Sequence, residues 1–336
     1  MTPEKNLLSI QNLTTSFHSE RGWIAAVEDV NLTVKPREIV AVVGESGSGK
    51  TVTCLSIIHL VAGRKMFQST GSIVFDGKEL IGASEAQMRS IRGGEIGMIF
   101  QEPMTSLNPV LTVGKQIDET LKAHTPLNAA ERRARIVELL RLVGIPEPEK
   151  RMKCYPFELS GGMKQRVMIA MALSCEPKML IADEPTTALD VTIQAQILLL
   201  LKELREKLNM SIILVSHDLG VVANFADRVV VMYAGKVLEE GTTAEVIHAP
   251  LHPYTRGLID SIPRLTQPRD EALHVIPGNI PELSDMPSGC RFAPRCPYAQ
   301  AQCWQQQPEM QEYEPGHSAR CFRIGEISKE GAHVQG

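Results

Sequence analysis

The sequence predicts an α/β fold with a parallel-rich sheet, an inserted helical subdomain and a small Cys-rich C-terminal appendage. Strand-like apolar segments that alternate with helical patterns predict the sheet, and a mostly helical stretch at about 102–177 predicts the insertion. Prolines accumulate from residue 250 onward and four of the seven cysteines follow Gly289, which predicts a loop-rich appendage. We therefore expect a core domain over residues 1–250 and an extension over residues 251–336.

The first predicted strand of the sheet, residues 38–43, stops at Gly44, and a helical segment follows Lys50. Between them, residues 44–51 match the phosphate-binding pattern G-x-x-x-x-G-K-[ST] in the strand–loop–helix context that this motif needs. Backbone N–H groups of such a loop wrap phosphates, its lysine neutralises their charge, and its hydroxyl ligates Mg²⁺. The predicted phosphate-binding residues are Gly44, Ser46, Gly47, Ser48, Gly49, Lys50 and Thr51, with Thr51 also as a Mg²⁺ ligand.

Further predicted elements follow the order of a sheet with crossover helices. A strand at 95–100 leads into Gln101, and residues 128–143 have the apolar spacing of a helix. Strands at 179–182 and 211–216 flank a predicted crossover helix at 192–208. This alternation favours a parallel sheet covered on its faces.

Two carboxylates, Asp183 and Glu184, end the predicted strand at 179–182. Beside a phosphate loop, Asp183 can hold the magnesium shell, and Glu184 can polarise an attacking water as the catalytic carboxylate. The alternative is a buried acidic pair without a role, which is disfavoured because unpaired buried carboxylates are costly.

The segment Leu159-Ser160-Gly161-Gly162-Met163 stands between the phosphate loop and these carboxylates. In this order the three motifs resemble the ATP-binding subunits of ATP-binding cassette (ABC) transporters, which implies a P-loop NTPase fold with an ABC ATPase core. The resemblance implies that Ser160, Gly161 and Gly162 open a helix that closes over ATP bound to a partner subunit. Met163 stands where the family commonly has glutamine, which leaves open whether the two ATP sites are equivalent.

The same resemblance implies roles for further residues. Gln101 corresponds to the glutamine that senses the γ-phosphate near the Mg²⁺ ion, and His217 corresponds to the switch histidine. Both are expected to act in catalysis, and Asp190 corresponds to the loop that passes between two ATPase subunits. Phe17 fits the aromatic side chain that stacks on adenine, with Trp23 as a competing candidate and a plain core role for either left open.

Two longer segments point to one branch of the family. Residues 101–109 (Q-E-P-M-T-S-L-N-P) and 252–255 (H-P-Y-T) resemble the ATP-binding subunits of oligopeptide and dipeptide permeases. This implies that ATP hydrolysis drives the uptake of dipeptides or oligopeptides. The partners would be a second ABC ATPase subunit, expected to be a paralogue, two membrane permease subunits and an extracytoplasmic solute-binding protein. An importer of nickel, glutathione or another peptide-like solute, an exporter subunit and a soluble non-transport ABC ATPase stay as alternatives.

The tail reads Cys290-x5-Cys296-x6-Cys303-x17-Cys321. Structural zinc sites usually pair cysteines about two to four residues apart, whereas a [4Fe–4S] cluster takes four thiolates. We expect these four cysteines to hold a [4Fe–4S] cluster, with Zn²⁺ or no metal as alternatives. We also expect this tail to be a module separate from the phosphate loop. The other cysteines, read as small apolar residues, are Cys54, Cys154 and Cys175.

Composition limits the other functions. The net charge is −4, with 43% hydrophobic and 22% charged residues, and nothing in this balance indicates nucleic-acid binding. The N-terminus lacks the regions of a secretion signal, and no run reaches the ~18 apolar residues that span a bilayer. We expect a peripheral protein on the cytoplasmic face of the cell membrane.

Overall fold

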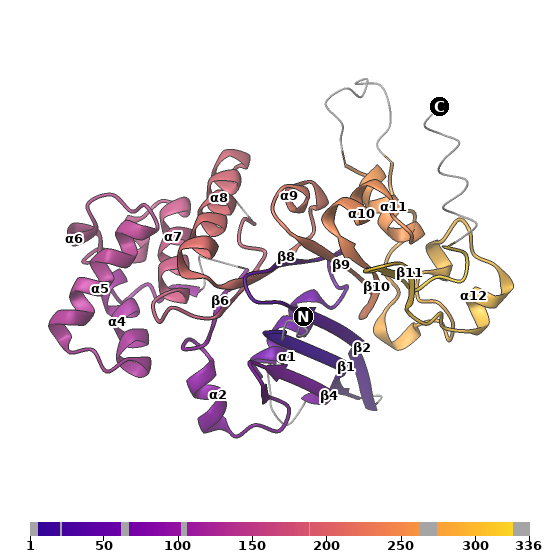
Figure 1. Cartoon of the computed structure of the whole chain (residues 1–336), viewed down its shortest axis with the longest axis horizontal. Coiled ribbons are helices and arrows are strands. Elements are labelled where there is room, and N and C mark those ends of the chain that lie inside the picture. The colour runs from indigo at the N-terminus through magenta and orange to yellow at the C-terminus, as the bar shows by residue number, and fades with distance from the viewer. Residues whose placement is uncertain are drawn as a thin grey trace. The chain divides into compact units, whose positions relative to one another are not determined.

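The computed structural model describes residues 6–20, 22–61, 67–101, 106–187, 189–262 and 274–324. The chain forms two compact units, and the colours of Figure 1 follow the chain through both. The first unit contains the described residues within Met1–Leu7, Val34–Glu38 and Gly82–Val215. The second unit contains the described residues within Leu8–Thr33, Ile39–Ile81 and Ser216–Gly336.

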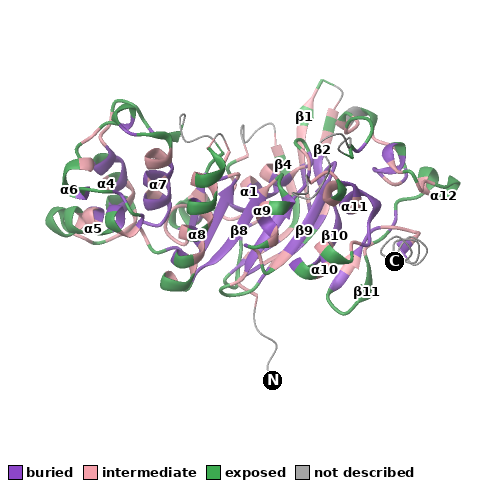
Figure 2. Ribbon diagram, turned by 90° about the horizontal axis from the view of Figure 1, so that it is seen from above, coloured by how far each residue is buried: buried purple, intermediate pink, exposed green. Residues whose placement is uncertain are grey.

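Three parallel strands form the sheet of the first unit. They are β6 (Ile96–Ile99), β7 (Met179–Asp183) and β8 (Ser211–Ser216), with β7 in the middle. Every residue of β7 is buried, which is typical of a parallel strand covered on both faces. Its neighbour β8 is also mostly buried and is labelled among the purple strands of Figure 2. The crossover helix α8 (Val191–Leu208) joins β7 to β8 and buries Ile197, Leu201 and Leu204, so the predicted strand–helix–strand unit is confirmed.

The remaining helices of this unit mostly lie between β6 and β7 in the sequence. Helix α5 begins after Asn128, whose side chain accepts hydrogen bonds from the N–H groups of Ala130 and Glu131, and it buries an apolar face against α4 and α7. The predicted helix at 128–143 is therefore confirmed. The elements are α2 (Glu85–Ile91), α4 (Val113–His124), α5 (Ala129–Leu142), α6 (Pro148–Arg151), the 3₁₀ turn η1 (Pro156–Glu158) and α7 (Gly161–Ala172).

An antiparallel sheet in the second unit was absent from the predicted elements. Its strand order is β2-β1-β4-β5, and β1 pairs with β4 in a register that shifts between Gln11 and Thr14. Asn12 has a left-handed backbone at this bulge, with φ 50°. The strands are β1 (Leu8–Ser19), β2 (Gly22–Val34), β4 (Phe67–Phe75) and β5 (Lys78–Glu79).

The second sheet of this unit mixes strand directions. β3 (Ile39–Val43) pairs in parallel with β9 (Arg228–Tyr233), and β9 pairs antiparallel with β10 (Lys236–Thr242). Ala234 and Gly235, the two residues that join β9 to β10, both have positive φ, as a tight type I′ hairpin requires. Strands β12 (His317–Ala319) and β11 (Gln311–Glu314) continue the sheet antiparallel beyond β10. The α/β fold is confirmed, but the predicted parallel-rich sheet is corrected to a mixed one.

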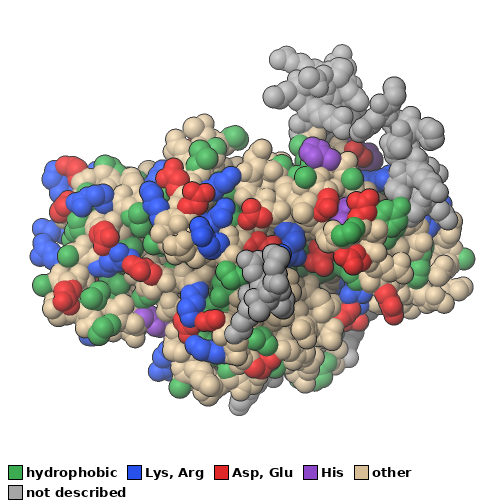
Figure 3. Space-filling model, viewed as in Figure 1, with side chains coloured by type: hydrophobic (Ala, Val, Ile, Leu, Met, Phe, Trp, Pro, Cys, Tyr) green, Lys and Arg blue, Asp and Glu red, His purple; other side chains and the backbone are tan. Residues whose placement is uncertain are grey.

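The helices of the second unit are short, and no helix within the described ranges of either unit is long and apolar enough to cross a membrane. On the face shown in Figure 3, basic and acidic side chains are interspersed. The helices and 3₁₀ turns are α1 (Lys50–Ile57), α9 (Leu219–Ala223), α10 (Thr243–His248), α11 (Pro253–Asp260), η2 (Leu283–Asp285), η3 (Ala293–Arg295) and α12 (Ala301–Gln305).

A fully buried carboxylate fastens the C-terminal residues to the sheet of the second unit. Glu239 on β10 accepts hydrogen bonds from the N–H groups of Leu251 (2.8 Å) and His252 (2.9 Å). Its Oε1 also lies 2.8 Å from Nε2 of His317 on β12. One side chain therefore ties β10, the start of α11 and β12 together.

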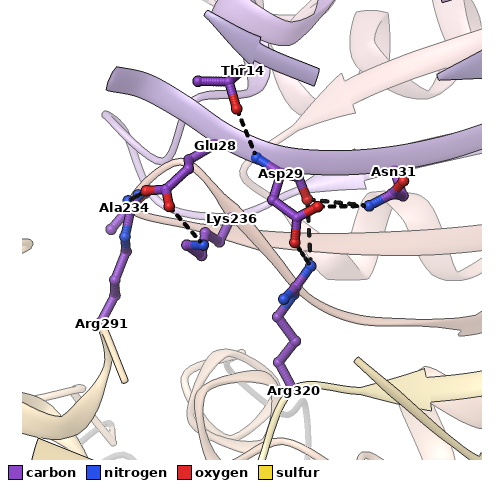
Figure 4. A network of polar contacts seen from close by, with 8 residues as sticks. All are labelled: Thr14, Glu28, Asp29, Asn31, Ala234, Lys236, Arg291 and Arg320. Atoms are coloured by element: carbon purple, nitrogen blue, oxygen red, sulfur yellow. Dashed lines mark hydrogen bonds and ion pairs between the residues drawn. The ribbon is translucent and has the colours of Figure 1, made fainter. Parts of the chain in front are cut away.

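Two arginines of the tail make further ion pairs with β2 (Figure 4). Arg291 pairs with Glu28, which also pairs with Lys236 at 3.2 Å, and Arg320 pairs with Asp29 at 2.6 Å. Burial lowers the pKa of Lys236, and the charge of Glu28 opposes this effect. The tail is thus held to the antiparallel sheet by paired, partly buried charges.

Candidate nucleotide-binding site

The phosphate loop lies between β3 and α1, as the sequence predicts. A side chain at Gly44 would put its Cβ 2.1 Å from the carbonyl oxygen of Met232, so only glycine fits there. Gly49, with φ 100°, caps α1 in the left-handed conformation that glycine adopts without strain. Ser46 and Gly47, at the tip of the loop, are exposed. The loop therefore presents backbone N–H groups and the N-terminus of α1 to a phosphate ligand.

Lys50 lies at the start of α1 and is only 4% exposed. Its ammonium donates hydrogen bonds to the carbonyl oxygens of Gly44 (2.7 Å) and Glu45 (2.9 Å). Thr51 follows in the first turn of α1 and is half-buried. The ammonium of Lys50 is thus held against the backbone of the phosphate loop by these two hydrogen bonds.

The predicted catalytic carboxylate contacts the predicted glutamine within the first unit. Oε2 of Glu184 accepts a hydrogen bond from Nε2 of Gln101 at 3.1 Å. The same oxygen accepts a hydrogen bond from the hydroxyl of Thr187 at 2.9 Å. Glu184 has a left-handed backbone, with φ 46°, which is uncommon for a residue with a side chain. Asp183, at the end of β7, is 2% exposed.

Ser160 and Asp190 are both exposed helix caps in the first unit. Oγ of Ser160 accepts a hydrogen bond from the N–H of Met163 at the start of α7. Oδ1 of Asp190 accepts a hydrogen bond from the N–H of Ile193 at the start of α8. A Cβ at Gly162 would lie 3.3 Å from Ile193, so α7 and α8 approach closely at their N-termini, next to Gly161. Ser160, Gly161 and Asp190 are therefore close to one another at the exposed N-terminal ends of these two helices.

His217 and Phe17 belong to the second unit. His217 follows β8 and is exposed, and Asp218 after it caps α9. Phe17 lies within β1, is half-buried and packs against Phe67 with ring centroids 6.2 Å apart. Trp23, the competing candidate for adenine stacking, is 51% exposed. The adenine contact of either ring remains a prediction. Residues 102–105 of the permease-like segment 101–109 lie outside the described residues.

The four tail cysteines line one small cavity together with His252 and Phe292. All are free thiols, and burial raises the pKa of Cys296 and of Cys321 to about 11, with a further contribution from neighbouring cysteines. Across the described residues, no group of three or more His, Cys, Asp or Glu side chains is arranged so that it could hold a metal ion. The four cysteines therefore lie around one cavity, but their side chains are not arranged as a metal-binding site.

The tail also contacts the phosphate loop, so the prediction of a separate module is wrong. Arg295, next to Cys296, forms two hydrogen bonds with the carboxylate of Glu45. The hydroxyl of Tyr254 on α11 accepts a hydrogen bond from the N–H of the same glutamate at 2.9 Å. Glu45 was not predicted because it occupies a variable position of the phosphate-loop motif. Arg295 was not predicted because only the cysteines of its segment form a recognisable pattern. Thr187 was also not predicted, because it lies beyond the predicted strand and its two carboxylates. Its N–H donates to the carbonyl oxygen of Glu184 at 3.1 Å, and this turn brings its hydroxyl to the Glu184 carboxylate.

Comparison with known proteins places the chain. Residues 27–187 match the family described as ABC transporter, and residues 238–303 match the oligopeptide/dipeptide transporter C-terminal region. The oligopeptide transport ATP-binding protein AppD of Bacillus subtilis is 53% identical over 326 residues, which cover 96% of this chain and 98% of AppD.

Two solved structures share the fold. The ATP-binding cassette MJ0796, in a dimeric post-hydrolysis state bound to ADP and Pi, has a TM-score of 0.63 and 31% identity, over 70% of this chain and 98% of its own. CbiO1 of Clostridium perfringens, part of the ABC transporter complex cbiONQ, has a TM-score of 0.62 and 30% identity, over 73% of this chain and 92% of its own. The chain therefore belongs to the ABC transporter ATP-binding proteins, in the branch with the oligopeptide/dipeptide transporter C-terminal region.

Proposed function

We propose that this chain is the ATP-hydrolysing subunit of an importer that takes up dipeptides or oligopeptides. The observation that carries the proposal is the similarity to an oligopeptide transport ATP-binding protein along almost the whole chain, tail included. A fold alone would not name a function, but the phosphate loop and the Glu184–Gln101 contact supply the chemistry of an ATPase.

In the proposed mechanism, the N–H groups of residues 47–50 bind the β- and γ-phosphates of ATP. Lys50 leaves its two carbonyl partners in the loop to neutralise the phosphate charge. The hydroxyl of Thr51, the carboxylate of Asp183 and the amide oxygen of Gln101 are the oxygen ligands that suit Mg²⁺. When bound, Mg²⁺ neutralises charge that develops on the phosphates.

Glu184 is the proposed general base for the attacking water. Gln101 and Thr187 both donate to its Oε2, and these bonds fix the orientation of the carboxylate. A catalytic base must be held within hydrogen-bonding reach of the proton that it accepts. His217 is proposed to contact the γ-phosphate, and Phe17 to stack on adenine.

We assign Ser160, Gly161, Gly162 and Asp190 to the ATP site of a second ABC ATPase subunit. What supports this is their position on exposed helix N-termini, which attract anions, and the dimeric state of the similar cassette MJ0796. The complete transporter would add two membrane permease subunits and an extracytoplasmic solute-binding protein. This chain would then lie at the cytoplasmic face of the membrane.

The domain boundaries stay part of the proposal: an ATPase domain over 1–250 with a helical subdomain at about 102–177, and an extension over 251–336. Helices α4 to α7, all between β6 and β7, support the helical subdomain. The short elements after α11 support a loop-rich extension.

We also assign a [4Fe–4S] cluster to Cys290, Cys296, Cys303 and Cys321. Four free thiols around one cavity suit a ligand set of four thiolates. Burial that disfavours the thiolates would be offset by a bound cation, since metal binding and thiol ionisation are coupled. The cluster would supply a covalent link between segments of the tail, and the cysteines would close around it.

Uptake by cells tests the transport proposal. Cells that lack this chain should lose the uptake of a labelled dipeptide or tripeptide, and the wild-type chain should restore it while Glu184→Gln should not. Restored nickel or glutathione uptake, with peptide uptake unchanged throughout, would overturn the peptide assignment.

Metal analysis tests the cluster. Protein purified without oxygen should be brown, absorb broadly near about 400 nm and contain about four irons and labile sulfide. Zinc without iron would replace the cluster by a structural zinc site, and neither metal would leave four ordinary thiols.

A further inference from the structure

The segment between the first two tail cysteines reaches the phosphate loop. The guanidinium of Arg295 donates from Nη1 to Oε2 of Glu45 at 2.6 Å and from Nη2 to Oε1 at 3.0 Å. This is a two-pronged pair of the kind that fixes geometry as well as charge. The Arg295 side chain is 5% exposed and that of Glu45 is 29% exposed, so the pair is largely shielded from water.

The surroundings of Arg295 hold it in place. Its guanidinium lies 5.7 Å from the centroid of the Tyr233 ring, and its Nη2 and Nε donate to the carbonyl oxygens of Ile276 and Pro277. Burial alone would lower the pKa of Arg295, but the hydrogen bonds to Glu45 and Tyr233 outweigh it and raise the pKa. Arg295 therefore stays protonated, and its guanidinium is held in one orientation.

Glu45 is held a second time through its backbone. Its N–H donates to the hydroxyl of Tyr254, which is fully buried, at 2.9 Å. Tyr254 packs edge-on against Tyr233, with ring centroids 4.8 Å apart, and contacts Phe292 of the cysteine segment at 5.3 Å. The side chain and the backbone of Glu45 are thus both fixed by residues that pack together.

Glu45 in turn fixes the lysine of the phosphate loop. Its carbonyl oxygen accepts hydrogen bonds from Nζ of Lys50 at 2.9 Å and from the N–H of Ser48 at 3.2 Å. The contacts therefore run without a break from Arg295 through Glu45 to Lys50. Glu45 is also a negative charge beside a loop built for anions, and Arg295 is the cation that compensates it.

We propose that Arg295 is a positioning residue for ATP binding, so that the cysteine segment 290–296 sets the affinity of the phosphate loop. A loop held in its binding conformation loses less entropy when the ligand arrives. Without Arg295, the loop would lose one of its two anchors at Glu45, and an uncompensated carboxylate would face the triphosphate. This proposal rests on ATP binding by the chain and goes beyond it, because it places control of that binding in the tail.

Titration of the full-length chain with a fluorescent ATP analogue and Mg²⁺ tests the proposal. Arg295→Met should weaken binding about five- to tenfold, or roughly 1 to 1.4 kcal/mol. Arg295→Lys keeps the positive charge but loses the two-pronged hydrogen bonding of the guanidinium. Its ATP affinity should lie between those of Arg295→Met and the wild type. In the double variant with Glu45→Gln, binding should be no weaker than in Arg295→Met alone, because both changes remove one interaction.

Arg320→Met is the matched control. Arg320 is another largely buried tail arginine, ion-paired with Asp29 at 2.6 Å, and its guanidinium hydrogen bonds within the described residues go to Asp29 on β2 and not to the phosphate loop. Its loss should lower the midpoint of thermal unfolding but leave ATP affinity within about twofold of wild type. Equal losses of affinity in Arg295→Met and Arg320→Met would overturn the proposal, since docking of the whole tail would then explain both.

Kinetics of the assembled transporter give an independent reading. Arg295→Lys should raise KM for ATP while kcat at saturating ATP stays within about twofold, because chemistry is unchanged. A lower kcat with unchanged KM, or losses that multiply in the double variant, would overturn the positioning role. A wild-type chain that binds no ATP would instead contradict the function itself.

Discussion

Nε2 of Gln101 donates a hydrogen bond to Oε2 of Glu184, although 83 residues separate the two in the chain. The glutamine follows β6 and the glutamate follows β7, and these strands are parallel neighbours. Parallel neighbours end at the same edge of a sheet, so residues just beyond their C-terminal ends meet there. The contact joins the proposed sensor of the γ-phosphate to the proposed base.

Glu184→Gln should stop turnover and leave ATP binding intact. The amide keeps the shape of the side chain but cannot take a proton, and general bases contribute about 10²- to 10⁴-fold in rate. The steady-state ATPase rate of the assembled complex and the affinity of the chain for ATP should be measured together. Hydrolysis at close to the wild-type rate would remove Glu184 from the mechanism.

Thr187→Val should slow hydrolysis by about tenfold, because a hydrogen bond to a charged group is worth about 1.5 kcal/mol and here orients the base. Thr187→Ser keeps the hydroxyl that lies 2.9 Å from Glu184 and is the control, with an expected rate close to wild type. If the two variants have the same rate, the hydroxyl has no part in orienting the carboxylate.

Lys50→Ala should weaken ATP binding about 10- to 100-fold, in line with the loss of a charged hydrogen bond of about 1.5–3 kcal/mol. Lys236→Ala is the control, since this buried lysine pairs with Glu28. Calorimetric titration with ATP and Mg²⁺ compares the two. An equal loss in both variants would show that a buried lysine is needed for folding and not for phosphate binding.

Cys296→Ser should bleach the cluster and also weaken ATP binding by a few-fold, because Arg295 is the adjacent residue and holds Glu45. Cys154→Ser changes a half-buried thiol of the other unit and should alter neither property. Absorbance near about 400 nm and ATP affinity are the readouts. Full loss of colour with unchanged affinity would separate the cysteines from the phosphate loop.

His252 should make the protein sensitive to acid. Burial lowers the pKa of His252 from 6.5 to about 4, while the charge of Glu239 opposes the shift. A folded-state pKa below the unfolded value means that its contribution to stability is complete above pH 6.5. The contribution is lost as the pH falls toward 4, by up to about 3 kcal/mol.

His252→Asn is the comparison for this effect, because an amide oxygen can still accept the hydrogen bond that Nδ1 of His252 accepts from the N–H of Tyr254. Denaturant unfolding at several pH values measures both proteins. The wild type should lose more free energy of unfolding than the variant between pH 6.5 and 4. Parallel curves would show that His252 is not the titrating group.

The ATPase motifs could be predicted because each is local. Residues 44–51 form a continuous loop, and the apolar run before Asp183 and Glu184 identifies its own strand. The antiparallel sheet escaped prediction because the bulge at Asn12 breaks the alternation of buried residues along β1. A pattern of period two is the main signal for such a strand.

Contacts between distant segments could not be predicted in the same way. Nothing near Glu45 in the sequence indicates a partner 250 residues later, and nothing near Cys296 indicates that Arg295 contacts the phosphate loop. These contacts depend on how β9, α11 and the tail pack in three dimensions. The spacing of apolar residues indicates whether one segment is a helix or a strand. A contact such as Glu45–Arg295 depends on how several segments pack against one another.

Glu239 has a consequence for protein engineering. Among the described residues, the hydrogen-bond partners of its carboxylate are Leu251, His252 and His317, which come after residue 250, and the carboxylate is fully buried. A chain shortened at residue 250 would leave this charge unpaired, at a cost of about 3–5 kcal/mol out of a typical total of about 5–15 kcal/mol. A minimal cassette or a chimera of this subunit must therefore carry its donor sequence through His317, because residues of the extension satisfy a carboxylate that is buried on β10.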